Sequence, residues 1–423
     1  AAELTASVQP ATAEAMVEAE AEWESLLECL VAAAEHCSAQ RSRAGRKEER
    51  LAERSFWSSL GGSVQAALDL LLPVLPPGRY TPPMARLLAR TSGAVQGRAL
   101  HLLRSQLSRE FSAKHSRRAA AAALSHAALA EIADALRVVC DATADGGTTA
   151  AGHGGGADEA AAQKNRQAAL LTLELLAREH AAAAPDVFER ATVAVVRAAC
   201  SAAPAVRSAG LLATSSFVEG LGAQLVPHMP AFLPKLLAML ESALPPPHDA
   251  PPSRDALSFA AAWLDGVGSS LLAAVPAFLP PFLPRLLRSL LRAPDLPTSG
   301  AAAVAGVDDA ASSAAALSER WAAFELAVAR ALPARLLARA LTELLPTALQ
   351  AGPAALVRLV SLLGHSLTSR PPAEALAHHR GAFDLLLAAA AFREARGAAA
   401  GGADAARVVE AAVGETTAKL VVL

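Results

Sequence analysis

Apolar residues recur three and four positions apart along almost the whole chain, a spacing typical of helices that bury one face. No segment alternates apolar and polar residues over a length that would predict a sheet. Helices are predicted over residues 13–38, 53–75, 81–90, 92–107, 120–140, 165–180, 185–200, 203–222, 228–243, 254–273, 276–292, 313–331, 333–350, 353–368 and 373–396, with a last helix up to Leu423.

Several of these helices have a well-defined apolar face. Small Ala and Gly residues in the face of 203–222 would let neighbouring helices approach closely, and Gly220 and Gly222 are predicted to end this helix. The faces comprise Trp23, Leu26, Leu27, Leu30 and Val31 in 13–38, Val95, Ala99, Leu102 and Leu103 in 92–107, and Val206, Ala209, Ala213 and Phe217 in 203–222.

Proline, glycine and charge mark the predicted connections. Pro73, Pro76 and Pro77 are expected to close the helix 53–75, because proline lacks the N–H that continues a helix. Loops rich in Gly and Ala are predicted at 145–160, 298–312 and 397–406. The charged stretch 41–50 holds both signs, which favours a solvated loop or helix start; the alternative is a nucleic-acid or localisation patch.

A proline-broken apolar phrase occurs twice, as MPAFLPKLLAML from Met229 and as LPPFLPRLLRSL from Leu279, 50 residues later. Helix-pair repeats of the HEAT and armadillo type have periods of about 40–47 residues, and a longer loop accounts for the difference. The sequence therefore predicts an all-α fold, a HEAT/armadillo-like α-solenoid of stacked antiparallel helix pairs. Its expected parts are an N-terminal helix and charged loop (1–52), helical repeats (53–144), a Gly/Ala-rich loop (145–160), HEAT-like repeats (161–396) and a segment 397–423 that a family resemblance implies is the truncated start of a C-terminal domain.

Composition narrows the possible functions. The chain is 53% hydrophobic and 4% aromatic, with a net charge of −2, which argues against a nucleic-acid clamp along its whole length. Residues 266–284 contain no charge, but Pro276, Pro280, Pro281 and Pro284 would break a membrane-spanning helix. We expect a turn between two solenoid helices there.

Motifs for catalysis, cofactors and metals are missing from the sequence. Cys29, Cys37, Cys140 and Cys200 lack metal-ligand spacing and are interpreted as free thiols of a reducing compartment. Cys29 and His36 lie two helical turns apart, too far to share a zinc ion, and His378 and His379 point in different directions on a helix. We predict no catalytic, cofactor-binding or metal-binding residues, no small-molecule substrate and a non-enzymatic protein.

Two further sets of residues carry structural predictions. Arg98 and Arg207, in the similar contexts VQGRAL and AVRSAG, are interpreted as charges that tether neighbouring repeats; contact with a partner is the alternative. Core packing is predicted for the four tryptophans, Trp23, Trp57, Trp263 and Trp321.

The order of several segments resembles a known family. PAVRSAGLLATSSFVEGLG from Pro204 looks like the second helix of a HEAT repeat, and the two proline-broken phrases resemble first helices. RTSGAVQGRALHLLRSQL, NRQAALLTLELLAREHA, the two phrases, ALPARLL from Ala331 and HHRGAFDLLLAAAAFREAR follow one another in an order that resembles the C-terminal region of the small nucleolar RNA-associated protein 10 family. This family is the large HEAT-repeat subunit of the small-subunit processome. Phe383, Asp384, Phe392 and Arg393 correspond to the start of the family's C-terminal domain.

The resemblance implies a non-enzymatic scaffold that is located in the nucleolus, within the nucleus. It would act in pre-rRNA transcription and processing toward small-subunit rRNA. Its partners would be other processome proteins, with small nucleolar RNA and pre-rRNA contacted directly or through them. The alternatives are a nuclear transport receptor of the importin-β class and a HEAT adaptor of another complex. Because the chain starts at Ala1 and stops within an apolar pattern, we expect a fragment whose ends expose apolar faces and lower its solubility.

Overall fold

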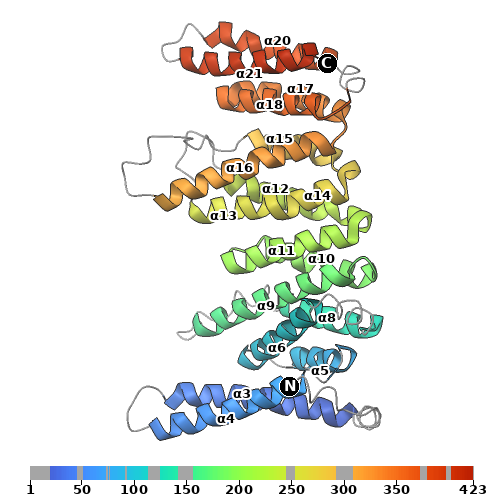
Figure 1. Cartoon of the computed structure of the whole chain (residues 1–423), viewed down its shortest axis with the longest axis vertical. Coiled ribbons are helices and arrows are strands. Elements are labelled where there is room, and N and C mark those ends of the chain that lie inside the picture. The colour runs from blue at the N-terminus through green and yellow to red at the C-terminus, as the bar shows by residue number, and fades with distance from the viewer. Residues whose placement is uncertain are drawn as a thin grey trace. The chain divides into compact units, whose positions relative to one another are not determined.

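The computed structural model describes residues 20–44, 51–72, 75, 77–90, 93–112, 124–141, 156–243, 253–291, 308–371, 379–396 and 402–422. These residues form helices and turns, with no strand among them (Figure 1). Contacts divide the chain into two compact units, residues 1–220 and 221–423. This boundary falls inside residues 161–396, which were predicted from the sequence to form one array of repeats.

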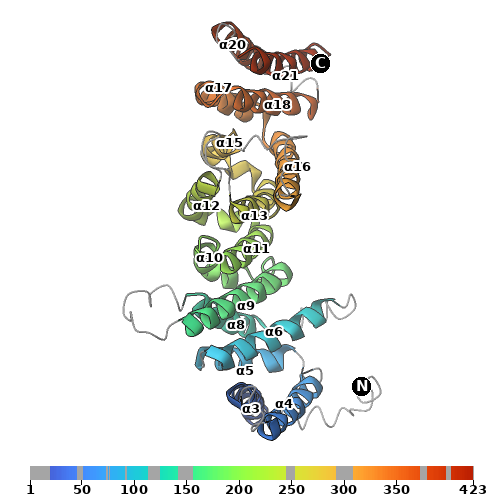
Figure 2. The same cartoon turned by 90° about the vertical axis from the view of Figure 1, so that its left-hand side faces the viewer.

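Unit 1 is a stack of helix pairs. Within it α3 contacts α4, α5 contacts α6 and α8 contacts α9 (Figures 1 and 2). Successive pairs contact each other in two rows, α5–α8–α10 on one side and α6–α9 on the other. The helices are α3 (Glu20–Ala44), α4 (Leu51–Leu71), α5 (Pro77–Arg90), α6 (Gly93–Ser112), α8 (His126–Asp141), α9 (Gly156–His180), α10 (Pro185–Ala199) and α11 (Pro204–Leu221).

The apolar face predicted for the last helix of unit 1 is confirmed, with Val206, Ala209, Ala213 and Phe217 all buried. Phe217 meets Phe188 of α10 edge to face, with ring centroids 5.6 Å apart. Gly210 lets the two helices approach, because a Cβ at this position would lie 2.3 Å from the backbone nitrogen of Ala199. Gly222 follows α11 with φ of +52°, a conformation that favours glycine, so the predicted helix end is confirmed at Gly222. It was wrong for Gly220, which lies inside α11.

Unit 2 has the same construction. One row consists of α12, α15, α17 and α20, and the other of the α13–α14 segment, α16, α18 and α21. The chain alternates between the rows, as stacked helix pairs require, so the predicted HEAT-like α-solenoid fold is confirmed. The helices are α12 (Met229–Ala243), α13 (Arg254–Ala262), α14 (Ser269–Ala274), α15 (Leu283–Leu291), α16 (Asp308–Ala331), α17 (Ala334–Ala351), α18 (Pro353–Thr368), α20 (His379–Arg396) and α21 (Gly402–Val422).

The two copies of the repeated phrase form α12 and α15, which contact each other in one row of unit 2. They differ at the start. A 3₁₀ segment, Gly222–His228, leads into α12, and two 3₁₀ turns, Pro276–Phe278 and Pro280–Phe282, precede α15. The helix predicted over 276–292 therefore begins as α-helix only at Leu283, because three of its first six residues are prolines without an N–H.

Long polar side chains satisfy carbonyl groups at helix C-termini across the stack. These carbonyls lack partners within their own helix and carry partial negative charge, so amide and guanidinium donors suit them. The bonds run from Gln106 to the carbonyl of Leu72 (3.0 Å), from Arg166 to that of Cys140 (3.1 Å), and from Arg370 to those of Ala329 and Leu332.

Unit 2 contains a π-helical turn that the sequence did not predict. Residues Trp263–Gly268 form this turn between α13 and α14, and the Ser269 hydroxyl donates to the carbonyl of Leu264 (2.8 Å). The extra residue in the turn brings Gly268 against Phe324 of α16, where a Cβ would lie 2.6 Å from the ring. The turn thus lets α16 pack closely on this segment.

The helical segment Arg254–Ala274 has the length and hydropathy of a membrane span, and most of it is buried inside unit 2. The turn expected within 266–284 is confirmed, because α14 ends at Ala274 and 3₁₀ turns follow. The charge-free stretch is therefore a corner between two core helices.

Several predicted boundaries were wrong. α5 begins at Pro77 instead of Thr81. Pro77 was expected to end the preceding helix, but proline also fits the first position of a helix. α9, α16 and α21 begin at Gly156, Asp308 and Gly402, inside the predicted loops, and acidic residues in the first two suit a helix N-terminus. The rest of those loops, residues 13–19 of the first predicted helix and most of 41–50 lie outside the described residues.

Candidate protein-interaction surfaces

Residue types that carry catalysis or bind metals do not gather in the described part of the chain. No group of three His, Cys, Asp or Glu side chains there could hold a metal ion. All four cysteines are free thiols: Cys29 is exposed, Cys200 is half-buried, and Cys37 and Cys140 are buried. His36 is exposed on α3, and His378 lies outside the described residues.

The tryptophans divide between core and surface. Trp263 and Trp321 are buried in unit 2, as predicted, and Trp263 contacts the ring of Phe324 edge to face at 5.9 Å. Core packing was wrong for Trp57, which is half-buried on α4 and meets the rings of His36 and Phe56 edge to face. The side chain of Trp23 lies outside the described ones.

Trp57 borders an open polar pocket of about 370 Å³ in unit 1. Three helices build it: the C-terminal half of α3, the middle of α4 and the second turn of α6. It is lined by Ala34, Cys37, Ser38, Arg41, Trp57, Ser58, Gly61, Gly62, Gln65 and Arg98. A volume in this range is typical of ligand-binding pockets.

The pocket wall is basic. Among the described residues, its lining contains the guanidinium groups of Arg41 and Arg98 and no Asp or Glu. Glu35 of α3 interacts electrostatically with Arg98: burial raises the pKa of Glu35, and the Arg98 charge opposes this rise. Arg98 therefore faces the preceding helix pair, as expected for a residue that tethers repeats, while Arg207 lies half-buried on α11 and its tethering role stays a prediction.

Two polar atoms of this wall have no hydrogen-bond partner within the described chain. They are Nε of Arg98, a donor, and Oε1 of Gln65, an acceptor; the Gln65 Nε2 group donates to Asp69 at 2.6 Å. Unpaired buried polar atoms are uncommon in folded proteins and cost about 1–3 kcal/mol each. Both atoms are therefore available to a ligand that reaches the wall.

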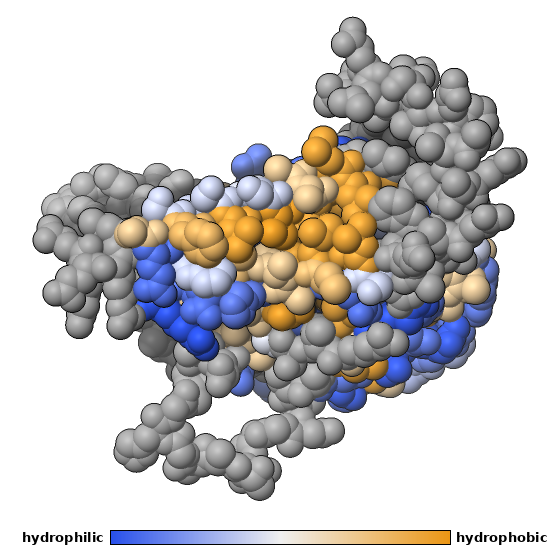
Figure 3. All heavy atoms as spheres, turned by 90° about the horizontal axis from the view of Figure 1, so that it is seen from below, coloured by the Kyte–Doolittle hydropathy of each residue, from blue (hydrophilic) through white to orange (hydrophobic). Residues whose placement is uncertain are grey.

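Exposed apolar side chains form a strip on the outer face of α3 and α4 (Figure 3). Figure 3 shows apolar side chains gathered in a band on this side of unit 1. The large exposed residues of the two helices are Leu26, Phe56, Leu60 and Leu70, of which Phe56 and Leu70 are more than half exposed. Because the Phe56 ring contacts Trp57 (5.1 Å), the strip reaches the pocket wall. We call the pocket and this strip the α3–α4 surface.

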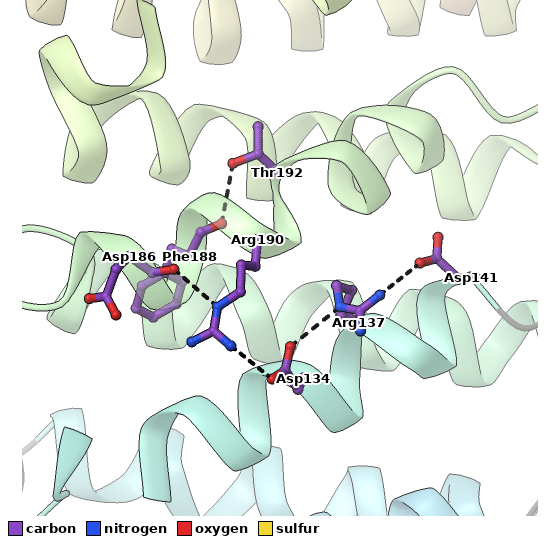
Figure 4. Close-up of polar contacts among 7 residues, drawn as sticks. All are labelled: Asp134, Arg137, Asp141, Asp186, Phe188, Arg190 and Thr192. Atoms are coloured by element: carbon purple, nitrogen blue, oxygen red, sulfur yellow. Dashed lines mark hydrogen bonds and ion pairs between the residues drawn. The ribbon is translucent and has the colours of Figure 1, made fainter. Parts of the chain in front are cut away.

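A second polar feature of unit 1 is a line of charges between α8 and α10 (Figure 4). Arg190 pairs with Asp134 (3.3 Å) and donates to the carbonyl of Asp186. Arg137 links Asp134 and Asp141 along α8. All these groups are substantially exposed, so each pair contributes little to stability.

The spacing of these pairs fixes the direction of the two helices. Asp134 pairs with Arg190 and Asp141 with Arg197 (2.9 Å), so a step of seven residues on one helix matches seven on the other. This constant offset requires α8 and α10 to run parallel, as equivalent helices of consecutive repeats do. The pairs thus mark the register of the stack.

Unit 2 holds a buried carboxyl group. Glu325 of α16 is 7% exposed, and burial raises its pKa to about 7, against the opposing effect of the Arg358 charge. A carboxyl group with such a pKa is partly protonated near neutral pH. It lies in the packed row of α16 and α18, and no described pocket opens onto it.

Sequence reasoning singled out Arg98 but missed the pocket around it. Arg41 and the adjacent glycines Gly61 and Gly62 also line this pocket. Two adjacent glycines inside an apolar helix were the available signal, because each costs about 1 kcal/mol of helix stability relative to alanine.

No protein-family model matches the chain, and no curated protein matches it. Similar solved structures include yeast importin-β (Kap95p), with a TM-score of 0.35 and 13% identity over 91% of this chain and 47% of that one. A second similar structure is a Kap95:Nup1 complex, with a TM-score of 0.37 and 13% sequence identity. The match covers 80% of this chain and 42% of the matched chain in that complex. The chain thus spans less than half the length of these structures, and its fold class is established by the helix pairs described above.

Proposed function

We propose that this chain is part of a non-enzymatic HEAT-repeat scaffold that binds other proteins in the small-subunit processome. It would act in the nucleolus, in pre-rRNA transcription and processing toward small-subunit rRNA. The observation that supports a role in this assembly is the order of the repeat segments from Arg90 to Arg396, which resembles the order in the small nucleolar RNA-associated protein 10 family.

The mechanism of such a scaffold is positional. Each unit buries its apolar side chains between stacked helices and presents the outer faces of those helices to solvent. The α3–α4 surface and the charged edge of α8 and α10 are distributed along unit 1. Partners would therefore bind over extended area, and small nucleolar RNA and pre-rRNA would be contacted directly or through bound proteins.

Affinity purification of the tagged full-length protein tests this function, with mass spectrometry and RNA sequencing of what co-purifies. Recovery of processome proteins together with pre-rRNA and small nucleolar RNA is expected. Recovery of a Ran-type GTPase and nucleoporins without pre-rRNA would replace the proposal with the alternative, a nuclear transport receptor of the importin-β class. Recovery of an unrelated complex would instead support the other alternative, that the protein is a HEAT adaptor of that complex.

A further inference from the structure

We propose that the α3–α4 surface binds an acidic amphipathic segment of a partner protein, with a carboxylate side chain of that segment held in the pocket between α3, α4 and α6. This inference depends on the proposed role as a protein-binding scaffold, but not on which assembly the scaffold joins. It assigns a chemical class of partner to one defined part of unit 1.

The charges of the pocket select an anion. Arg41 and Arg98 line it without any lining carboxylate, and neither forms an ion pair among the described residues. Glu35 offsets part of the Arg98 charge from outside the lining, which leaves a net positive wall. A carboxylate can accept two parallel hydrogen bonds from one guanidinium group, the strongest arrangement that such a wall offers.

The shape of the pocket keeps this site open. Gly62 lines it, and a Cβ at this position would meet no heavy atom within 4 Å. A side chain at residue 62 would therefore extend into the space that the ligand occupies. The half-buried Trp57 ring forms part of the same wall and provides an apolar contact for the methylene groups of a glutamate.

The surroundings favour a peptide over a phosphate backbone. The wall leaves both a donor, Nε of Arg98, and an acceptor, Oε1 of Gln65, without partners. A peptide segment offers carboxylate acceptors and, in side chains or in the first turn of a helix, N–H donors that can pair with both after small side-chain rotations, whereas a phosphate group offers acceptors alone. The exposed apolar residues Phe56 and Leu60, which neighbour the pocket residues Trp57 and Gly61 in sequence, match the apolar face of an amphipathic helix.

The test uses the purified full chain and fluorescence anisotropy of labelled probes. The first probe is a capped 14-residue amphipathic peptide with leucines on one face and glutamates on the other; its control replaces each glutamate with glutamine. We expect the glutamate peptide to bind at least tenfold more tightly. Arg98→Gln should weaken its binding about tenfold, and Arg41→Gln about threefold because Arg41 is exposed.

Gly62→Leu should abolish binding by filling the pocket while the protein remains folded. Gly62→Ala and Arg43→Gln are the matched controls, since alanine adds one carbon and Arg43 lies on the same helix end outside the pocket. Equal binding of the glutamine peptide, wild-type affinity of the Gly62→Leu protein, or no binding of the glutamate peptide would overturn the proposal.

A single-stranded RNA oligomer of the same charge is the third probe. Displacement of the glutamate peptide by this RNA at lower concentration would assign the pocket to phosphate and overturn the peptide assignment. Every probe is tested on purified protein, so the two proposals can fail separately. Failure of the peptide to bind would not affect the co-purification result, and failure of the processome assignment would not affect the peptide-binding result.

Discussion

Arg285 and Glu241 form a bidentate ion pair that joins the two copies of the repeated phrase. Nε and Nη2 of Arg285 on α15 donate to Oε1 and Oε2 of Glu241 on α12, at 3.2 and 3.1 Å. The Ser289 hydroxyl adds a weaker contact to the same carboxylate at 3.4 Å. The position equivalent to Arg285 in the first phrase is Lys235, which cannot form this fork.

Arg285→Lys is expected to destabilise unit 2 by about 1 kcal/mol, because lysine keeps the charge but loses the second hydrogen bond. The estimate is modest since the arginine side chain is 38% exposed. Urea denaturation of the wild type, Arg285→Lys, Glu241→Gln and the double variant gives the coupling energy. Additive effects of the two single substitutions would show that the second hydrogen bond of the fork contributes nothing.

Gly210→Ala should destabilise unit 1 by about 3 kcal/mol, because the new Cβ would overlap the backbone of α10 at Ala199. Gly62→Ala is the matched control: it also lies inside a helix, meets no neighbour within 4 Å, and should stabilise by up to about 1 kcal/mol. Hydrogen exchange of amides in α10 and α11 measures the first effect locally. Similar stability changes for the two variants would contradict the close approach.

Glu325 makes the stability of unit 2 depend on pH. Its folded-state pKa of about 7 lies above the ordinary value of 4.5, so the folded state binds more protons than the unfolded state between these values. The free energy of unfolding therefore falls as pH rises from about 4.5 to 7, by about 3 kcal/mol from this group.

Glu325→Gln should remove this dependence. We expect the variant to be about 2–3 kcal/mol more stable than the wild type at pH 8 and nearly equal at pH 4.5. Urea denaturation at both pH values measures the difference. Glu343→Gln is the control, because Glu343 is exposed on α17 and pairs with Arg339 of the preceding turn. A wild-type stability that does not fall across this range relative to Glu325→Gln would rule out the raised pKa.

The cysteines should differ in reactivity toward N-ethylmaleimide. Cys29 is exposed and should react within minutes in the folded protein. Cys140 should stay unmodified until the protein unfolds, because it is buried and burial raises its pKa to about 12. Peptide mass spectrometry over time separates the sites, and the unfolded protein in urea is the control in which both react. Rapid labelling of Cys140 in the folded protein would contradict the packing of α8.

The sequence by itself determined the fold class and most helices, because the spacing of apolar residues within a helix is local. The faces around Val206 and Ala99 needed no knowledge of what they would pack against. Capping signals act within one turn, so the predicted helix start at residue 185 and the predicted helix end at Gly222 were also confirmed.

Tertiary contacts decided the rest. The pocket joins Arg41, Gly62 and Arg98, which lie on three helices and share no local pattern. Trp57 has an apolar sequence context like that of Trp263, yet only the packing of α3, α4 and α6 leaves it at the surface. The π-helical turn packs against Phe324, about 60 residues away from it in sequence. Sequence periodicity shows which face of a helix is apolar, whereas the packing of distant helices determines which parts of those faces stay open to a partner.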